Sequence, residues 1–187
     1  MFVNFLDKLK SGIILGDGAM GTVLYSRGIF INRCYEELNL LQPNVIEEIH
    51  NEYINAGSEL IETNTFRANS ISLLKYGLAD KTEEINLKGA EIAIKAAANC
   101  DRKIAVAGSI GPTGLILENE IQNSRDDAAA AFTFQAQSLA KGGVDVIILE
   151  TFYSMDELVL AVESVKKAVS LPVLAQFTFD SGKAAKY

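Results

Sequence analysis

The stretch PNVIEEIHNEYINAGSELIETN, residues 43–64, contains the pattern that most clearly indicates the fold class. Its first part has apolar residues about one helical turn apart, with Pro43 near the start and Gly57 at the end. This pattern predicts a helix over 43–57. The apolar run that follows predicts a buried strand over 58–64. A helix that leads directly into a buried strand is the repeating unit of a parallel α/β fold.

Four further apolar runs predict buried strands, because Ile, Val and Leu follow one another without regular alternation with polar residues. These runs span 12–17, 103–109, 145–151 and 172–179. Helical patterns over 81–99, 126–143 and 154–170 separate the later runs. Strands that alternate with helices predict about five parallel strands in one sheet. The absence of a linker or a shift in composition predicts a single domain over 1–187.

Composition and charge exclude several classes of function. The chain has 187 residues, 49% of them hydrophobic, which is enough for one substantial core. Its net charge of −7 argues against nucleic-acid binding, which needs clustered Lys and Arg. No apolar run is long enough for a membrane-spanning helix, and residues 1–12 lack the apolar centre of a signal peptide. We therefore expect no membrane contact and a cytoplasmic location.

The two cysteines, Cys34 and Cys100, are far apart in the sequence, and neither belongs to a C-x-x-C pair. A disulfide is not expected in a reducing compartment, so both are interpreted as structural thiols. With His50, the only histidine, they make a poor set of metal ligands. No metal-binding residue is predicted in this chain.

Polar residues gather where the expected strands end. They are Asp17, Glu62–Asn64, Ser109, Glu150–Thr151 and Thr178. The carboxyl ends of parallel strands lie on one face of such a fold, and that face carries the site. An ordinary polar turn explains any one of these strand ends as well as a functional site does. It is a weaker explanation for all five strand ends together.

The motif GDGAMGT, residues 16–22, has the G-x-G-x-x-G spacing of a dinucleotide-binding loop. However, Asp17 would place a carboxylate against a pyrophosphate, no lysine completes a Walker loop, and no helix clearly starts at Thr22. An acid among glycines instead suits a cationic group, with backbone N–H groups nearby for a carboxylate. Glu150 supplies a second anion at another strand end, so we expect an amino-acid-like ligand.

Four motifs, in order and spacing, resemble the homocysteine S-methyltransferase family, and within it the homocysteine-binding domain of cobalamin-dependent methionine synthases. They are GDGAMGT, the stretch from Glu36 to Asn69, GSIGPTG over 108–114 and IILETF over 147–152. The resemblance implies a (β/α)8 TIM-barrel type of fold, truncated here to about five strands. The chain would be the N-terminal portion of that barrel, with no second domain, and the reaction would be methyl transfer to homocysteine, giving methionine.

The resemblance also implies roles for individual residues. Asp17 and Glu150 would hold the amino group of homocysteine. The loops that line the pocket would contain Ala19, Met20 and Gly21, and Thr63, Asn64 and Thr65, with Ser109 and the turn over 111–114 at the rim. Arg67 stands where the family usually has glycine, so it would crowd or recharge the mouth of the pocket.

In this family zinc activates the thiol and is held by three cysteines in later strands. Cys34 and Cys100 do not match those positions. The resemblance therefore implies that zinc belongs to the reaction but that this chain alone does not activate homocysteine. Cobalamin and methyltetrahydrofolate would act in the full-length parent, and S-methylmethionine and betaine remain open as alternative methyl donors.

A non-catalytic reading also remains open. Five strands do not close an eight-stranded barrel, so two sheet edges and an apolar interior would stay uncovered. The chain would then be a self-associating α/β module. The expected partners are homocysteine or methionine, and either the rest of the barrel or a second copy.

Overall fold

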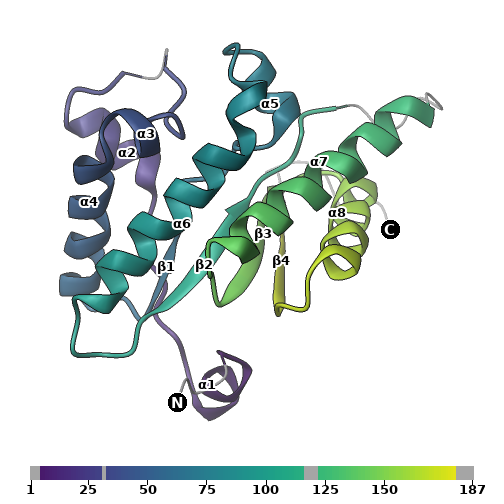
Figure 1. Ribbon diagram of the computed structural model, residues 1–187. Helices are drawn as coiled ribbons and strands as arrows, with labels where there is room; N and C mark the ends of the chain where they lie inside the picture. Colours follow the sequence, from purple (N-terminus) through teal and green to yellow (C-terminus); the bar gives the residue numbers. More distant parts are fainter. Residues whose placement is uncertain (1–4, 31–32, 116–121, 180–187) are drawn as a thin grey trace.

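The computed structural model describes residues 5–30, 33–115 and 122–179, and these are built around one parallel sheet (Figure 1). Its strands are β1 Leu60–Glu62, β2 Ala105–Ile110, β3 Val146–Phe152 and β4 Val173–Phe177. The helices are α1 Phe5–Ser11, α2 Met20–Ser26, α3 Leu38–Leu41, α4 Pro43–Ala56, α5 Ser70–Leu74, η1 Ala79–Lys81, α6 Thr82–Ala98, α7 Gln122–Lys141 and α8 Met155–Ala168. Each strand pairs with the next one in the sequence, which is the arrangement of a (β/α) barrel wall.

Side chains of the strands alternate between two faces of the sheet. On the outer face the sheet packs against a row of helices, in which α4 contacts α6, α6 contacts α7 and α7 contacts α8 (Figure 1). The outer cluster includes Ile61, Val106 and Ile147, and the inner cluster consists of Phe5, Leu60, Ala107, Val146 and Ile148. Because the period of a strand is two residues, Glu62, Ser109 and Glu150 lie on the inner face, towards the carboxyl ends of the strands.

The helix and strand predicted over 43–64 are confirmed. Helix α4 begins at Pro43, whose missing N–H costs nothing at a helix start, and it ends before Gly57, whose φ of 118° is left-handed. Its buried residues include Ile46, Ile49 and Ile54, and β1 follows within the expected range. The helices expected over 81–99, 126–143 and 154–170 are present as α6, α7 and α8.

The prediction of a strand over 12–17 is wrong. In this segment only Gly16 forms a β-bridge, to Leu60, and the backbone carbonyl of Leu15 accepts from Glu59 and Leu60. Ile13 is 96% exposed and Leu15 is 55% exposed. A run of this composition becomes a strand when neighbours on both sides bury it, and in the described part of the chain it has β1 on one side alone.

The expectation that no helix starts near Thr22 is also wrong, because α2 begins at Met20. Its N-cap residue, Ala19, makes no side-chain capping bond. The helix is instead held by tertiary packing, since Leu24 is fully buried beside Ile46 and Ile49 of α4. Packing of this kind leaves little local signal in the sequence.

The sheet has an open side at β4. Among the described residues β4 pairs with β3 alone, Ala175 and Gln176 are exposed, and Phe179 just after the strand is 66% exposed. Ile13 lies in the segment beside β1, at the opposite end of the sheet. Within the ranges described, no helix has the length and apolar character that crossing a membrane requires.

His50 is a buried polar residue on α4 with a consequence for stability. Neither of its ring nitrogens has a hydrogen-bond partner among the described atoms. Burial lowers the pKa of His50 to about 4 from its ordinary 6.5, although the charge of Glu47 opposes this shift. The folded chain therefore binds the imidazole proton less readily than the unfolded chain, and stability is lost as the pH falls below 6.5.

We expect His50→Leu to remove this acid-side loss while preserving the packing volume. The free energy of unfolding of the wild type should fall between pH 7 and pH 5 by about 2 kcal/mol more than that of the variant. Urea unfolding at the two pH values measures this difference. Parallel pH dependences for the two chains would show that His50 titrates normally in the fold.

Candidate functional site

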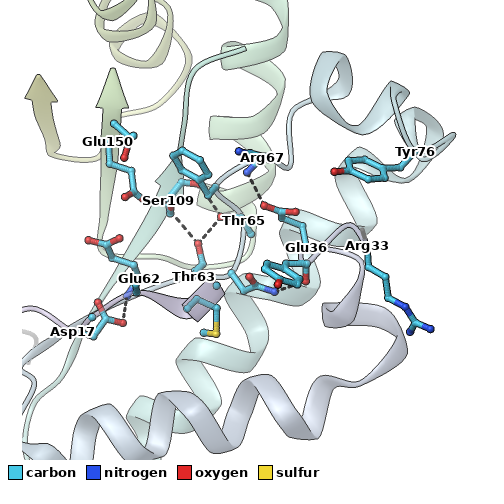
Figure 2. Close-up of a pocket in the computed structure, with 18 residues that line it drawn as sticks. Asp17, Arg33, Glu36, Glu62, Thr63, Thr65, Arg67, Tyr76, Ser109 and Glu150 are labelled. Atoms are coloured by element: carbon cyan, nitrogen blue, oxygen red, sulfur yellow. Dashed lines mark hydrogen bonds between the residues drawn. The ribbon is translucent and has the colours of Figure 1, made fainter. Parts of the chain in front are cut away.

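A cavity of about 790 Å³ opens at the carboxyl ends of β1, β2 and β3 (Figure 2). All nine residues predicted from the sequence as a binding site line it: Asp17, Ala19, Met20, Gly21, Thr63, Asn64, Thr65, Ser109 and Glu150. The other lining residues are Gly18, Arg33, Tyr35, Glu36, Glu62, Phe66, Arg67, Tyr76 and Thr151. The fold thus brings the predicted residues together, and their role in binding remains a prediction.

The glycine-rich loop is held against α4 and β1. The Asp17 carboxylate accepts a hydrogen bond from the backbone N–H of Glu62 at 3.0 Å, which fixes the acid over the end of β1. The Tyr53 hydroxyl of α4 donates to the carbonyl of Ala19 at 3.1 Å. A Cβ at Gly18 would lie 2.8 Å from the Tyr53 hydroxyl oxygen, so a larger residue there would force the Tyr53 side chain to shift.

A ring of hydrogen bonds joins the exits of β1 and β2. The Thr65 hydroxyl donates to the Ser109 carbonyl at 2.7 Å, and the Ser109 N–H donates to the Thr63 hydroxyl oxygen at 3.0 Å. The two threonine hydroxyls lie 2.6 Å apart. Because the only hydroxyl proton of Thr65 goes to Ser109, the proton between the threonines comes from Thr63. Thr63 and Thr65 are therefore committed to holding the two strand ends together.

Asn64 is also committed to the framework. Its side-chain amide donates to the carbonyl of Tyr35 at 2.8 Å and to the side-chain oxygen of Asn39 at 3.0 Å. Asn39 returns a hydrogen bond to the Asn64 carbonyl at 2.8 Å. These bonds fix the loop after β1, so that its backbone forms one wall of the cavity.

Glu150 enters the cavity at an irregular point of β3. The pairing of β3 with β4 shifts between Leu149 and Phe152, and Thr151 has a φ of 62°. A left-handed conformation is unfavourable for a β-branched residue, and such positions concentrate at functional sites. The Ser109 hydroxyl donates to the Glu150 carboxylate at 2.5 Å, so the ring at β1 and β2 also positions this acid.

Three carboxyl groups meet at the inner end of the cavity, those of Asp17, Glu62 and Glu150 (Figure 2). Burial, the charge of Glu150 and the charge of Asp17, in that order, raise the pKa of Glu62 to about 8. Burial raises the pKa of Asp17 to about 6, with a smaller contribution from Glu150, and the bond from the Glu62 N–H opposes the rise. No ion pair in the described ranges joins any of the three to a cation.

Glu62 is the residue that the sequence-based site left out. It stands at a predicted strand end, but neither the residue pattern nor the family resemblance gave it a role of its own. The strand period is the signal that could have identified it. Glu62 lies two residues beyond Leu60 on the same strand, so its side chain must point to the same inner face.

The similarity of this chain to known proteins shows its family. The family model of homocysteine S-methyltransferase matches residues 14–186. The methionine synthases of Mycobacterium tuberculosis and Mycobacterium leprae are 34% and 33% identical over 95% of this chain. The chain belongs to the homocysteine S-methyltransferase family. It spans 16% of the length of those two relatives.

Solved structures of this family have the same fold. The homocysteine methyltransferase MmuM from Escherichia coli, in its metallated form, superposes with a TM-score of 0.78 at 25% identity over 91% of this chain and 65% of MmuM. Its oxidized form gives a TM-score of 0.72 at 28% identity, over 94% and 64% of the two chains. The expected α/β fold of truncated barrel type is thereby confirmed, with four described strands where about five were expected.

The zinc that the family resemblance implies does not fit the residues described here. They include no group of three or more His, Cys, Asp or Glu side chains arranged for a metal ion. The Cys34 thiol donates to the Glu36 carboxylate at 3.3 Å, and burial with the Glu36 charge raises the pKa of Cys34 to about 12. Such a thiol is a poor metal ligand at neutral pH, because the ligand is the thiolate. Cys100 packs against the outer core, away from the cavity.

Two further expectations concern the rim. Arg67 does lie at the cavity mouth, where it is exposed, and its guanidinium carbon is 5.9 Å from the centre of the Phe66 ring. The turn over 111–114 does not line the cavity. Both the backbone N–H and the hydroxyl of Thr113 donate to the Glu157 carboxylate, so this turn anchors the loop after β2 to α8.

The hydrogen-bond ring predicts a specific cost for Thr63→Val. The change leaves the buried Ser109 N–H without its acceptor and Thr65 without its donor, which should lower the free energy of unfolding by about 1–3 kcal/mol. Thr133→Val is a matched control on α7, where the hydroxyl makes no hydrogen bond within the described part of the chain, and it should cost less than about 0.5 kcal/mol. Urea unfolding measures both, and equal small effects would show that the ring contributes nothing to stability.

Proposed function

We propose that this chain binds homocysteine as the amino-acid-binding part of a methyltransferase that produces methionine. The observation that carries the proposal is the acidic inner end of the cavity, in a chain of the homocysteine S-methyltransferase family. Asp17 and Glu150 reach it from different elements, and neither has a cation as partner in the described ranges. An ammonium group would supply the missing positive charge.

The rest of the amino acid has complementary groups in the same cavity. Ala19, Met20 and Gly21 lie at the start of α2, where the first backbone N–H groups of a helix have no acceptor in a preceding turn. In this proposal they hold the substrate carboxylate. The walls fixed by Thr63, Asn64 and Thr65 leave the side chain of homocysteine directed towards the open mouth.

The chain's own contribution in this proposal is to bind and orient the amino acid. Thiol activation by zinc and the methyl donor, favoured as methylcobalamin reloaded from methyltetrahydrofolate, would come from parts of a longer protein. The 187-residue chain alone is then expected to be inactive. A single domain over 1–187 and a cytoplasmic location are part of the same proposal.

We expect Asp17→Asn to weaken the binding of L-homocysteine and L-methionine by about 10- to 100-fold, because a charged hydrogen bond to the ammonium group is lost. Asp101→Asn, at an exposed bend away from the cavity, is the matched control and should bind as the wild type does. Isothermal titration calorimetry measures both. Equal affinities for wild type and Asp17→Asn would remove Asp17 from the site.

The open side of the sheet supports a second candidate, a non-catalytic module that associates with a second copy of itself. The observation that favours it is the exposure of Ile13 at one end of the sheet and of Phe179 at the other. Apolar groups and unpaired strand edges in such positions favour association. In a complete barrel, the remaining strands would cover the same surfaces.

Sedimentation velocity tests this candidate without any ligand. The wild type should show a mass that rises with concentration, and Ile13→Lys should reduce this association by placing a charge at the sheet end. Leu74→Lys, on α5 and similarly exposed at 68%, is the control and should associate as the wild type does. A wild-type chain that stays monomeric would exclude the module.

A further inference from the structure

Glu62 contacts both acids of the proposed ammonium site, and the proposed function gives it no task. Its backbone N–H donates to Asp17 at 3.0 Å. Its carboxyl group is close enough to that of Glu150 for the Glu150 charge to raise the pKa of Glu62. Figure 2 shows the Glu62 carboxyl group between the other two acids.

Like charges disfavour one another's ionisation, so three adjacent carboxyl groups that lack a cation partner among the described residues retain a proton. An ionised carboxylate only accepts hydrogen bonds, so two carboxyl groups bond to each other only when one of them is protonated. Glu150 already accepts the hydroxyl proton of Ser109. The described residues provide no hydrogen-bond donor to the Glu62 carboxyl group, and burial raises its pKa, so Glu62 is the residue that carries the proton.

We infer that the Glu62 carboxyl group holds a proton in the ligand-free site, and that the ammonium group of an amino-acid ligand displaces it. The inference rests on the proposed function. The O–H bond of Glu62 breaks and its proton passes to solvent, while no bond within the ligand changes. The ammonium group keeps its three N–H bonds and donates one to each of the three carboxylates, so its positive charge replaces that of the released proton and the net charge of the cluster is unchanged.

The charges around Glu62 agree with this assignment. Besides Asp17 and Glu150, the titratable neighbour on that side is Tyr53 of α4, whose pKa is raised by burial and by the Asp17 charge. It therefore stays neutral near pH 7 and offers no positive charge.

The other walls do not neutralise the cluster either. The cations that line the cavity, Arg33 and Arg67, are exposed and make no ion pair with the cluster among the described residues. The Glu36 side chain accepts from the backbone N–H of Arg67 and from the Cys34 thiol, and it supplies no positive charge. Because its pKa is about 8, the Glu62 carboxyl group is mostly protonated at pH 7 before a ligand binds.

The pH dependence of binding follows. Because the ligand binds the ionised form of Glu62, affinity should rise with pH, by up to about tenfold per unit, until the pH reaches about 8. Below about pH 6 the protonation of Asp17 should weaken binding further.

The ligand-free state is tested by ¹³C NMR of the chain labelled at the glutamate side-chain carboxyl carbons. One resonance should titrate near pH 8, disappear in Glu62→Gln and persist in the exposed control Glu84→Gln. A Glu62 resonance that titrates near the ordinary 4.5 would overturn the inference, whether or not the chain binds any ligand.

The displacement step is tested by calorimetry with L-methionine at pH 7 in phosphate and in Tris, whose ionisation enthalpies differ. The wild type and Glu84→Gln should release about 0.9 proton per methionine bound, and Glu62→Gln close to none. Saturable binding with the same enthalpy in both buffers would overturn displacement and leave the proposed function intact. A wild-type chain that binds no methionine would contradict the proposed function, and the displacement step with it.

Discussion

The site depends on one geometric constraint, the alternation of side chains along parallel strands that end at a common edge. The residues of β1, β2 and β3 that precede the site, such as Leu60, Ala107 and Ile148, fill the inner face of the sheet. Two residues further along each strand, the same face carries Glu62, Ser109 and Glu150. Apolar packing thus brings polar groups from distant parts of the sequence into one cavity.

Within that cavity the polar groups divide into two kinds. The hydroxyls of Thr63 and Thr65 are used internally, and their ring with Ser109 fixes the strand ends. The carboxyl groups of Glu62 and Glu150 have no cation as partner in the described residues. Their burial therefore costs free energy until a ligand supplies a positive charge. A rigid frame around an uncompensated negative charge favours a ligand with an ammonium group over a neutral one.

Much of this could be predicted from the sequence, because the strongest signals were local. The helix caps of α4 and the apolar runs of the strands predicted the alternation of elements correctly. What the sequence did not show depended on tertiary context. The segment 12–17 has strand composition without two neighbours, α2 is held by Leu24 packing on α4, and the loop at 111–114 turns towards Glu157.

The role of Glu62 was missed for a related reason. Strand ends were read as polar positions, while the charge that matters arises only when three acids from separate elements are placed together. The same applies to Thr63 and Thr65, which line the cavity as expected but whose hydrogen bonds show a supporting task.

A crystal structure of the 187-residue chain with L-methionine tests the central claim most directly. We expect the ligand nitrogen to lie within about 3 Å of carboxylate oxygens of Asp17, Glu62 and Glu150. A ligand nitrogen elsewhere in the cavity, with these three acids left without contact to it, would contradict the account.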